Sequence, residues 1–410
     1  MNKKKILWLS DSPTTTTGFA TITRNILNGL KNNYECHCLG HNYIGQTLTP
    51  PITFEDSERL DFHLHGTGKA KYSLDKIKPI ISKYHIDIFG GLLDTFMLYE
   101  SDFMNCDLSP AFTFWYYPSD GGGGLPQNCE NILKKIHLPI AMSKFAQKQV
   151  LKVHGINSEY IPHGYDPKIF YPLPQKEKEK IRKDWALTNK FVVGVVARNQ
   201  PRKQLDRTIK AFALFCRDKP EVVLLLHCDP LDMAAGFSII NLIKRLKLNN
   251  RVLFTGTTFY DAFDYTKMNQ IYNLMDVFFL STSGEGFGVP IIEAMACGVP
   301  QLITDYTTTK ELVIDNGQTG EAILLTGEDK YCPDPHCDEI LDGTITGGWD
   351  VERGIMSIYD AVDKLNKLYN DRNLLKKYGK VGIEKAKIFY AWDVVMPMWR
   401  NVLNKLGGQK

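Results

Sequence analysis

The stretch Phe191-Val-Val-Gly-Val-Val-Ala197 decides the fold of this chain. Its β-branched residues run without polar interruption, which predicts a strand buried on both faces rather than one side of a solvated sheet. The segment Arg198-Asn-Gln-Pro-Arg-Lys203 follows, and a helix is expected over Leu205–Phe215. The same strand–loop–helix theme returns downstream, with strands predicted over Val222–Leu226, Val252–Thr255, Val277–Leu280 and Gln301–Thr304. This alternation predicts a parallel sheet covered by helices.

The first 170 residues show the same alternation. Helices are predicted over Gly18–Leu30 and Lys144–Val153, and buried strands over Ile6–Leu9, Ile86–Phe89, Phe112–Tyr116 and Pro139–Met142. Between the two halves, Pro172 and Pro174 precede the charged run Lys176–Lys183, which we interpret as a linker or an exposed helix. The chain is therefore expected to be α/β, with two Rossmann-like domains in tandem joined near residue 175. Such domains bind ligands beyond the carboxyl ends of their strands and in the cleft between them.

Composition excludes several classes of protein. The 410 residues are 43% hydrophobic and 23% charged, which is typical of globular domains and unlike collagen or a disordered tail. The net charge is only +3, and neither half carries a basic excess, so bulk charge gives no case for a polyanionic partner. No repeat of 20–50 residues is visible, which excludes a solenoid.

The cysteines and the amino-terminal residues indicate a reducing, cytoplasmic compartment. The nine cysteines are odd in number and scattered, unlike a secreted disulfide framework. The start of the chain is basic and then apolar, but its apolar stretch is too short for a signal peptide and runs into Asp11. No apolar run approaches the roughly 18 residues of a membrane span.

Two strand-end loops could bind phosphate. Ser10–Gly18 combines hydroxyls, a glycine and a helix N-terminus, which suits an anion, although Thr17 could equally be a simple helix cap. Arg198 and Lys203 flank Pro201 and could hold a diphosphate from two sides, although basic residues are also common in surface loops.

The strongest motif is Ser283-Gly-Glu-Gly-Phe-Gly-Val-Pro-Ile-Ile-Glu293-Ala-Met-Ala-Cys-Gly-Val-Pro300. Its glycines at 284, 286 and 288 let backbone amides approach a ligand. A carboxylate accepts two hydrogen bonds at once, so Glu293 suits a ribose diol and Glu285 a sugar hydroxyl. The alternative interpretation is a capped helix with one core ion pair.

This motif, with its spacing Glu285-x7-Glu293, resembles the signature of retaining glycosyltransferases of family 4, which have the GT-B fold. Four other segments resemble family motifs in the same order: Arg198-x4-Lys203, Ile161-Pro-His-Gly-Tyr-Asp166 with Phe170, Asn273-Leu-Met-Asp276 and Tyr390-Ala-Trp392. The matches cover most of residues 140–325 and are weak before residue 110.

The resemblance implies an enzyme that moves a sugar from a nucleotide-diphosphate sugar to an acceptor hydroxyl with retention. It implies an acceptor-side domain over 1–172, a donor-binding domain over 173–385 and a C-terminal helix, about 386–410, crossing back to the first domain. Catalytic roles are expected for Arg198, Lys203, Glu285 and Asp120. Donor contacts are expected from Thr17, Gly18, Arg198, Lys203, Glu285, Gly286, Phe287, Gly288 and Glu293. No Asp-x-Asp pair occurs in the chain, so we expect no obligatory metal and no other cofactor.

Three departures bear on the acceptor side and on the family pattern. The family's first loop often has a Gly-Gly pair, where this chain has Thr16-Thr17-Gly18. Many members carry a His-Asp pair where this chain has Tyr117-Pro-Ser-Asp120, so Asp120 alone could orient a hydroxyl, or could simply end the strand in a turn. The segment Gly327–Gly348 is long and contains Cys332, His336 and Cys337, which we interpret as a solvent loop, with zinc binding as the alternative.

The donor base, the sugar and the acceptor stay open at this stage. The acceptor could be a glycan, a lipid, a small molecule or a modified nucleoside in DNA or tRNA, and peripheral membrane contact and the oligomeric state are also open. Two other classes share the architecture: a nucleotide-sugar epimerase or phosphorylase, and a non-catalytic nucleotide-sugar binder. Eight of the ten histidines precede residue 164. We take this clustering as surface composition and assign it no function.

Overall fold

The computed structural model describes residues 3–53, 59–126, 128–232, 236–258, 263–326, 339–341, 344–347 and 351–407. These residues form two compact units. The first comprises the described residues within 1–119, 123–164 and 392–410, and the second those within 120–122 and 165–391.

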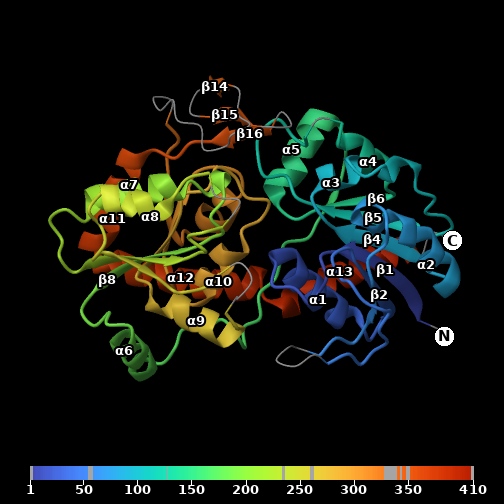
Figure 1. Cartoon of the computed structure of the whole chain (residues 1–410), viewed down its shortest axis with the longest axis horizontal. Helices are drawn as coiled ribbons and strands as arrows, with labels where there is room; N and C mark the ends of the chain where they lie inside the picture. Colours follow the sequence, from blue (N-terminus) through green and yellow to red (C-terminus); the bar gives the residue numbers. More distant parts are fainter. Residues whose placement is uncertain are drawn as a thin grey trace. The chain divides into compact units, whose positions relative to one another are not determined.

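The first unit is built on a seven-stranded parallel sheet of order β3-β2-β1-β4-β5-β6-β7 (Figure 1). Its strands are β1 (Lys4–Ser10), β2 (Tyr34–Gly40), β3 (His63–His65), β4 (Ile88–Leu92), β5 (Phe112–Tyr117), β6 (Leu138–Ala141) and β7 (Glu159–Tyr160). Its helices are α1 (Gly18–Leu30), α2 (Leu74–Tyr84), α3 (Thr95–Tyr99), α4 (Glu130–Lys135), α5 (Lys144–His154) and α13 (Trp392–Gly407), with short 3₁₀ turns η1 (Lys71–Ser73) and η2 (Phe103–Asn105).

Alternate residues of β1 serve the two faces of this sheet, as the pleat requires. Leu7 and Leu9 pack into a core shared with residues of α2, α3, α4 and α5. Trp8 points to the other face, where its Nε1 donates to Thr23 of α1 at 3.1 Å and its ring meets Trp399 of α13 at 5.5 Å. The last helix of the chain is therefore part of the core of the first unit.

Three strands of this unit, β2, β3 and the two-residue β7, were not predicted from the sequence. β2 alternates small apolar residues, Cys36 and Cys38, with Glu35 and His37, which is a strand pattern of period two. The pattern is hard to recognise because its polar positions hold a glutamate and a histidine rather than lysines, which are common at solvent-facing positions. β3 has only three residues, too few for any periodicity.

The second unit has a six-stranded parallel sheet of order β10-β9-β8-β11-β12-β13. Its strands are β8 (Phe191–Val196), β9 (Val222–His227), β10 (Val252–Phe254), β11 (Val277–Leu280), β12 (Gln301–Thr304) and β13 (Gly320–Ile323). β8 is buried along its whole length, as its apolar run predicts.

Helices cover both faces of this sheet (Figure 1), with α7, α8 and α11 packed together and α9, α10 and α12 on the opposite side. Their bounds are α6 (Gln175–Asp184), α7 (Leu205–Phe215), α8 (Ile239–Arg245), α9 (Tyr265–Leu274), α10 (Val289–Ala296), α11 (Ile358–Asn370) and α12 (Arg372–Phe389), with turns η3 (Pro201–Lys203) and η4 (Lys310–Ile314). The charged run that we interpreted as linker or exposed helix is α6, which buries only Ile181. The α/β fold with two parallel sheets is thus confirmed.

A small antiparallel sheet follows β13. Its strands are β14 (Glu339–Leu341), β15 (Thr344–Gly347) and β16 (Val351–Gly354). β16 forms a bridge with Gly122, which belongs to the same unit. The proposed zinc ligands Cys332, His336 and Cys337 lie outside the described residues.

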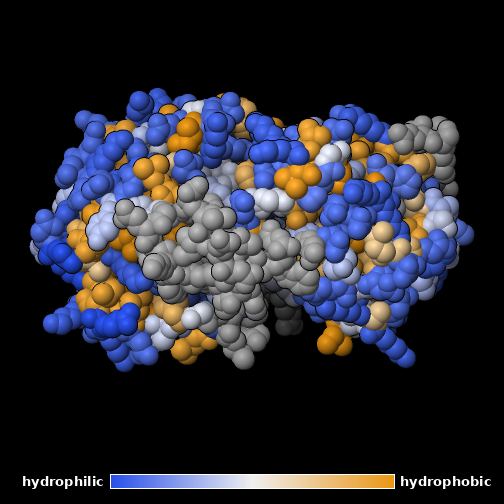
Figure 2. Space-filling view, turned by 90° about the horizontal axis from the view of Figure 1, so that it is seen from above, coloured by the Kyte–Doolittle hydropathy of each residue, from blue (hydrophilic) through white to orange (hydrophobic). Residues whose placement is uncertain are grey.

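The seven cysteines in the described part of the chain are all free thiols. Among the described helices, none combines the length and apolar character that a membrane span requires. On the face shown in Figure 2, hydrophobic residues are interspersed with hydrophilic ones.

Candidate donor-binding site

The candidate site lies in the second unit, where the order of the parallel strands reverses. β8 pairs with β9 on one side and with β11 on the other. Loops that follow two such strands leave in opposite directions and open a crevice at their carboxyl ends, which is where open α/β sheets bind ligands. The loop after β8 holds Arg198 and Lys203, and the loop after β11 holds Glu285.

A buried ion pair joins these two loops. The Lys203 ammonium donates to the Glu285 carboxylate, and both side chains are almost fully buried. Arg202, which the sequence analysis did not select, also contacts Glu285 at 3.4 Å and donates to the carbonyl of Gly284 at 3.0 Å. The core ion pair of the alternative interpretation is therefore present, and it connects two of the predicted donor-binding residues.

The charges of this pair depend on one another. Burial lowers the pKa of Lys203 to about 8, with Arg202 adding to the effect and Glu285 opposing it. Burial would raise the pKa of Glu285, but Lys203 and Arg202 outweigh it and hold that pKa below its ordinary range. Lys203 and Arg202 thus place two cations beside the Glu285 carboxylate, and the nearby Asp120 carboxylate has its own partner in Arg353.

Arg198 has a different partner. Its guanidinium binds the carboxylate of Asp232 through Nε at 2.7 Å and Nη2 at 3.2 Å. The Arg198 side chain is 41% exposed, whereas that of Asp232 is 2% exposed. The guanidinium is thus held by a buried carboxylate, while the side chain as a whole stays partly exposed.

Steric constraints explain why glycine occupies two positions in the loop between β11 and α10. A Cβ on Gly284 would lie 1.7 Å from the carbonyl oxygen of Asp120, so only glycine allows this close backbone approach. Gly288 has φ +106° immediately before α10, a conformation that favours glycine. The loop therefore leads tightly into the N-terminus of α10, where backbone amides lack helical partners.

Glu293 lies on α10 and accepts a hydrogen bond from the Tyr272 hydroxyl at 2.6 Å. Burial raises the pKa of Glu293 to about 7, against the opposing effect of that hydrogen bond. Among the described residues no lysine, arginine or histidine forms an ion pair with this carboxylate. Such an acid is costly to bury without further partners, and a ligand hydroxyl could supply them.

Three buried polar side chains near the strand ends lack partners. Asn199, 1% exposed, has neither its amide nitrogen nor its oxygen bonded within the described chain. The hydroxyls of Ser283 and Thr308 are likewise buried without a partner in the described residues. Native proteins rarely leave such groups unsatisfied, so these residues point to a ligand. The sequence analysis missed all three, although Asn199 and Ser283 directly adjoin motif residues.

Asp120 is part of the second unit and pairs with Arg353 of β16. The carboxylate lies 2.9 Å from Arg353 Nη1, which also donates to the Asp120 carbonyl at 3.0 Å. Burial would raise the pKa of Asp120, but Arg353 and Arg202 hold it below its usual range. Arg353 follows the long insertion, and no motif in the sequence marked it.

The loop after β1 is organised around Asp11 in the first unit. Asp11 accepts from the Thr17 hydroxyl at 2.5 Å and contacts His41 Nε2 at 2.8 Å. Thr17 also caps α1, accepting from the Ala20 amide at 3.1 Å, as the alternative interpretation predicts. A Cβ on Gly18 would meet nothing within 4 Å, so the chain does not require glycine there for packing.

A separate hollow of about 460 Å³ lies beside α7 and α11, lined by residues that include Arg207, Arg217 and Tyr359. None of its lining residues is a predicted site residue, and we assign it no role.

The fold and this site define a GT-B protein. The match to solved structures covers the whole chain: sucrose-phosphate synthase from Thermosynechococcus elongatus superposes with a TM-score of 0.74 at 16% identity, over 100% of both chains. HepE from Anabaena, solved with UDP and glucose, superposes with a TM-score of 0.70 at 17% identity, over 98% of this chain and 100% of that one. Residues 177–325 match the model of the family of glycosyl transferases group 1.

Curated relatives match part of the chain. Mannosylfructose-phosphate synthase of Agrobacterium fabrum is 28% identical over 181 residues, which is 42% of this chain and 38% of the relative. The lipopolysaccharide core biosynthesis mannosyltransferase LpsB of Rhizobium meliloti is 28% identical over 171 residues, 41% of this chain and 46% of the relative. The similarity thus spans less than half of the length of each of these relatives.

Proposed function

We propose that this protein is a retaining glycosyltransferase that transfers a sugar from a nucleotide-diphosphate sugar to an acceptor hydroxyl. The observation that carries the proposal is the cationic cluster of Lys203 and Arg202 around Glu285, at the strand-order reversal of the second unit. A diphosphate is the ligand that such a cluster, together with a helix N-terminus, suits best.

In this proposal each donor contact has a defined task. Glu293 accepts hydrogen bonds from the ribose diol, and Glu285 accepts one from a sugar hydroxyl. Arg198, Lys203 and the amides of Gly286, Phe287 and Gly288 hold the diphosphate. Asn199 and Ser283, buried without partners in the described chain, become donor contacts as well.

The reaction breaks the bond from the sugar C1 to the diphosphate oxygen and forms a bond from C1 to the acceptor oxygen on the same face. The acceptor proton passes to the departing phosphate oxygen, so no side chain has to be a strong base. Positive charge at Arg198 and Lys203 stabilises the diphosphate as it leaves, which is the kind of effect that usually dominates catalysis. These cations replace a divalent ion, and we propose that the enzyme needs no metal.

Asp120 is proposed to orient the acceptor hydroxyl. Its ion pair with Arg353 keeps it ionised and fixes its carboxylate, leaving oxygen lone pairs for a hydroxyl hydrogen. The acceptor itself is a glycan, a lipid or a small molecule in this proposal, and a modified nucleoside in DNA or tRNA is the alternative.

The names of related proteins guide the choice of probes. HepE was solved with UDP and glucose, and two curated relatives are named as sugar-phosphate synthases. We would therefore screen uridine, guanosine and adenosine diphosphate sugars by thermal shift, since saturating ligand adds about 2.7 kcal/mol at 100 times its Kd. Donors that bind would then be incubated with pooled sugar, sugar-phosphate and lipid acceptors, and the anomeric configuration of the product read by NMR.

The outcomes separate the three classes. Transfer with retained configuration supports the proposal, and inverted product contradicts the retaining mechanism. Conversion of the donor sugar to its epimer would indicate an epimerase. A reaction between free sugar and phosphate would indicate a phosphorylase. Tight donor binding with neither transfer nor donor hydrolysis would indicate a binding protein.

A further inference from the structure

Four residues on the β2–β3 edge of the first unit bring ligand-type side chains to one face. Glu35 and His37 are two residues apart on β2 and therefore project to the same side. His63 of β3 is the register partner of His37, and His65 follows two residues later. Contrary to our interpretation of the histidines as surface composition, the side chain of His37 is fully buried and His65 is 3% exposed.

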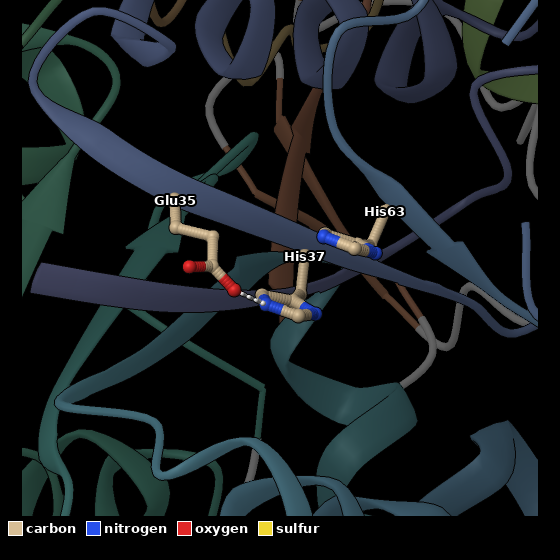
Figure 3. A group of neighbouring side chains, drawn as sticks. All are labelled: Glu35, His37 and His63. Carbon is tan, nitrogen blue, oxygen red and sulfur yellow. Dashed lines mark hydrogen bonds and ion pairs between the residues drawn. The ribbon is translucent and has the colours of Figure 1, made fainter. Parts of the chain in front are cut away.

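We propose that Glu35, His37 and His63 form a binding site for a divalent transition metal, with Zn²⁺ as the best-suited ion. One ligand atom from each of these residues lies within 4.8 Å of the others. Figure 3 shows how the three side chains lie relative to one another. Two imidazoles and one carboxylate match the ligand preference of Zn²⁺ and related ions rather than that of Mg²⁺ or Ca²⁺.

The His37 and Glu35 ligand atoms are already close to the separation that a bound ion requires. His37 Nε2 and Glu35 Oε1 are 3.1 Å apart. Ligand atoms around a tetrahedral Zn²⁺ with bonds near 2.0–2.1 Å are separated by roughly 3.4 Å. Metal binding therefore replaces the hydrogen bond between these two groups with two bonds to the ion, with almost no change in their separation.

His63 supplies the adjustable ligand. Its ring lies parallel to that of His37, with centroids 4.4 Å apart and planes 8° apart, so their lone pairs do not yet converge. The His63 Nδ1 atom is buried and has no hydrogen-bond partner in the described chain. Because no bond of that atom holds the ring, rotation about its side-chain torsions is inexpensive and satisfies an otherwise orphaned group.

The groups behind His37 can accept the proton rearrangement that metal binding needs. His37 Nδ1 lies 2.9 Å from His65 Nε2, and His65 Nδ1 lies 3.2 Å from the Thr47 hydroxyl. With the metal on His37 Nε2, His37 Nδ1–H donates to His65, and His65 Nδ1–H donates to Thr47. A metal-bound histidine whose other nitrogen is held in this way is the usual arrangement in metal sites.

Lys5 is the competing cation. Its ammonium pairs with Glu35 at 3.2 Å, and the two side chains are 31% and 38% exposed. An exposed pair of this kind contributes little stability, so Lys5 can turn to solvent when an ion binds. The fourth metal position then falls to water. The site lies at the amino-terminal half of β2, away from the strand-end loops, so its role is to fix the edge strand β3 rather than to take part in transfer.

The full-length protein, stripped of metal with a chelator, should be titrated with Zn²⁺ against a chromophoric competitor. We expect one site in the wild type. Glu35→Gln and His63→Phe should each weaken it by about 100-fold, because each removes one ligand from a site that keeps the other two. His85→Asn is the matched control, since His85 is exposed at the end of α2 and is no ligand. Glu35 is partly exposed, so its variant is expected to fold, and near-ultraviolet circular dichroism would verify this.

Co²⁺ substitution identifies the ligands. Nitrogen and oxygen ligands give d–d bands without thiolate charge-transfer bands, and the bands should vanish in Glu35→Gln. Thiolate bands, which would place the ion on cysteines such as Cys332 and Cys337, would overturn the proposal. Unchanged Zn²⁺ affinity in both ligand variants, or no binding in the wild type, would overturn it as well.

Discussion

Lys203 and Glu285, which are 82 positions apart in the sequence, form one buried ion pair between the loops that follow β8 and β11. The pair fixes the relative positions of two loops that the strand-order reversal would otherwise let diverge. It also keeps a lysine in contact with a carboxylate until a more strongly charged group, such as a diphosphate, approaches. The predictions below follow from this arrangement and from the buried groups around it.

The ionisation of Glu293 should make stability depend on pH. The folded protein raises the pKa of this carboxyl from 4.5 to about 7, so it binds more protons than the unfolded chain between these values. Stability from this group is therefore present at low pH and is lost as the pH rises through 7. Glu293→Gln should be more stable than the wild type at pH 8 by about 2 kcal/mol, and nearly equal to it near pH 4, below the unfolded pKa.

Urea unfolding at both pH values would measure this difference. The matched control is Glu177→Gln, because Glu177 is exposed on α6.

If Glu293 is the ribose ligand, Glu293→Ala should also weaken binding of the nucleoside diphosphate. An unchanged affinity for every nucleotide that binds the wild type would remove Glu293 from the site.

The cationic residues should matter for turnover. Arg198→Ala and Lys203→Ala should each lower the transfer rate by roughly 10²–10³-fold, the scale for loss of one charge-stabilising donor. Lys210→Ala is the control, because Lys210 lies on the adjacent α7, where it pairs with Asp206 at 3.0 Å. Activity should survive EDTA. Loss of activity with chelator and its recovery with Mg²⁺ or Mn²⁺ would contradict a metal-independent mechanism.

Replacing Asp120 should lower transfer to the acceptor and leave binding of the donor unchanged. Asp120→Asn keeps the size of the side chain but removes the charge that pairs with Arg353 at 2.9 Å. Transfer should fall while donor affinity and slow hydrolysis of the donor by water persist. Arg353→Gln, which breaks the same ion pair from the other side, distinguishes the roles. If both variants lose donor affinity equally, the Asp120–Arg353 pair only shapes the loop.

His163 should make the first unit sensitive to acid. The side chain is 4% exposed, and burial lowers its pKa to about 3. The Tyr116 hydroxyl donates to the Ile161 carbonyl at 2.9 Å, so at 2.8 Å it accepts from His163 Nδ1–H. The unfolded chain binds the proton first, near pH 6.5, and stability falls as the pH drops below that value.

The variant His163→Asn keeps a polar side chain at this position but removes the group that titrates. Between pH 7 and pH 5 the wild type should lose roughly 2 kcal/mol more stability than this variant. Thermal or urea unfolding at the two pH values measures the effect. Parallel pH profiles of the two proteins would show that His163 does not titrate as its burial requires.

The sequence predicts β8 to β12 of the second unit closely because their apolar runs are continuous, but it does not predict β13. Val277–Leu280 and Gln301–Thr304 are found with the expected bounds. The sequence does not reveal the partners of the charged residues, because those partners come from distant elements. Asp232 for Arg198 and Arg353 for Asp120 belong to no motif, and only the fold brings them near.

The buried polar groups that lack partners in the described chain could not be recognised from the sequence, for a different reason. Asn199 and Ser283 are ordinary loop residues by type, and burial alone makes them informative. The histidines of β2 and β3 were misjudged in the same way, because their number was visible and their burial was not. Register across a parallel pair places His37 beside His63, and no local pattern encodes that pairing.

The central claim is that the loops after β8 and β11 bind the diphosphate of a nucleotide donor. Calorimetric titration of the wild type, Arg198→Ala, Lys203→Ala and Lys210→Ala with one nucleoside diphosphate and with the matching nucleoside tests it most directly. The account predicts that Arg198→Ala and Lys203→Ala each lower the affinity for the nucleoside diphosphate by at least about tenfold, a loss of about 1.4 kcal/mol of binding free energy. The affinity for the nucleoside should stay unchanged. Equal diphosphate affinity in all four proteins would contradict it.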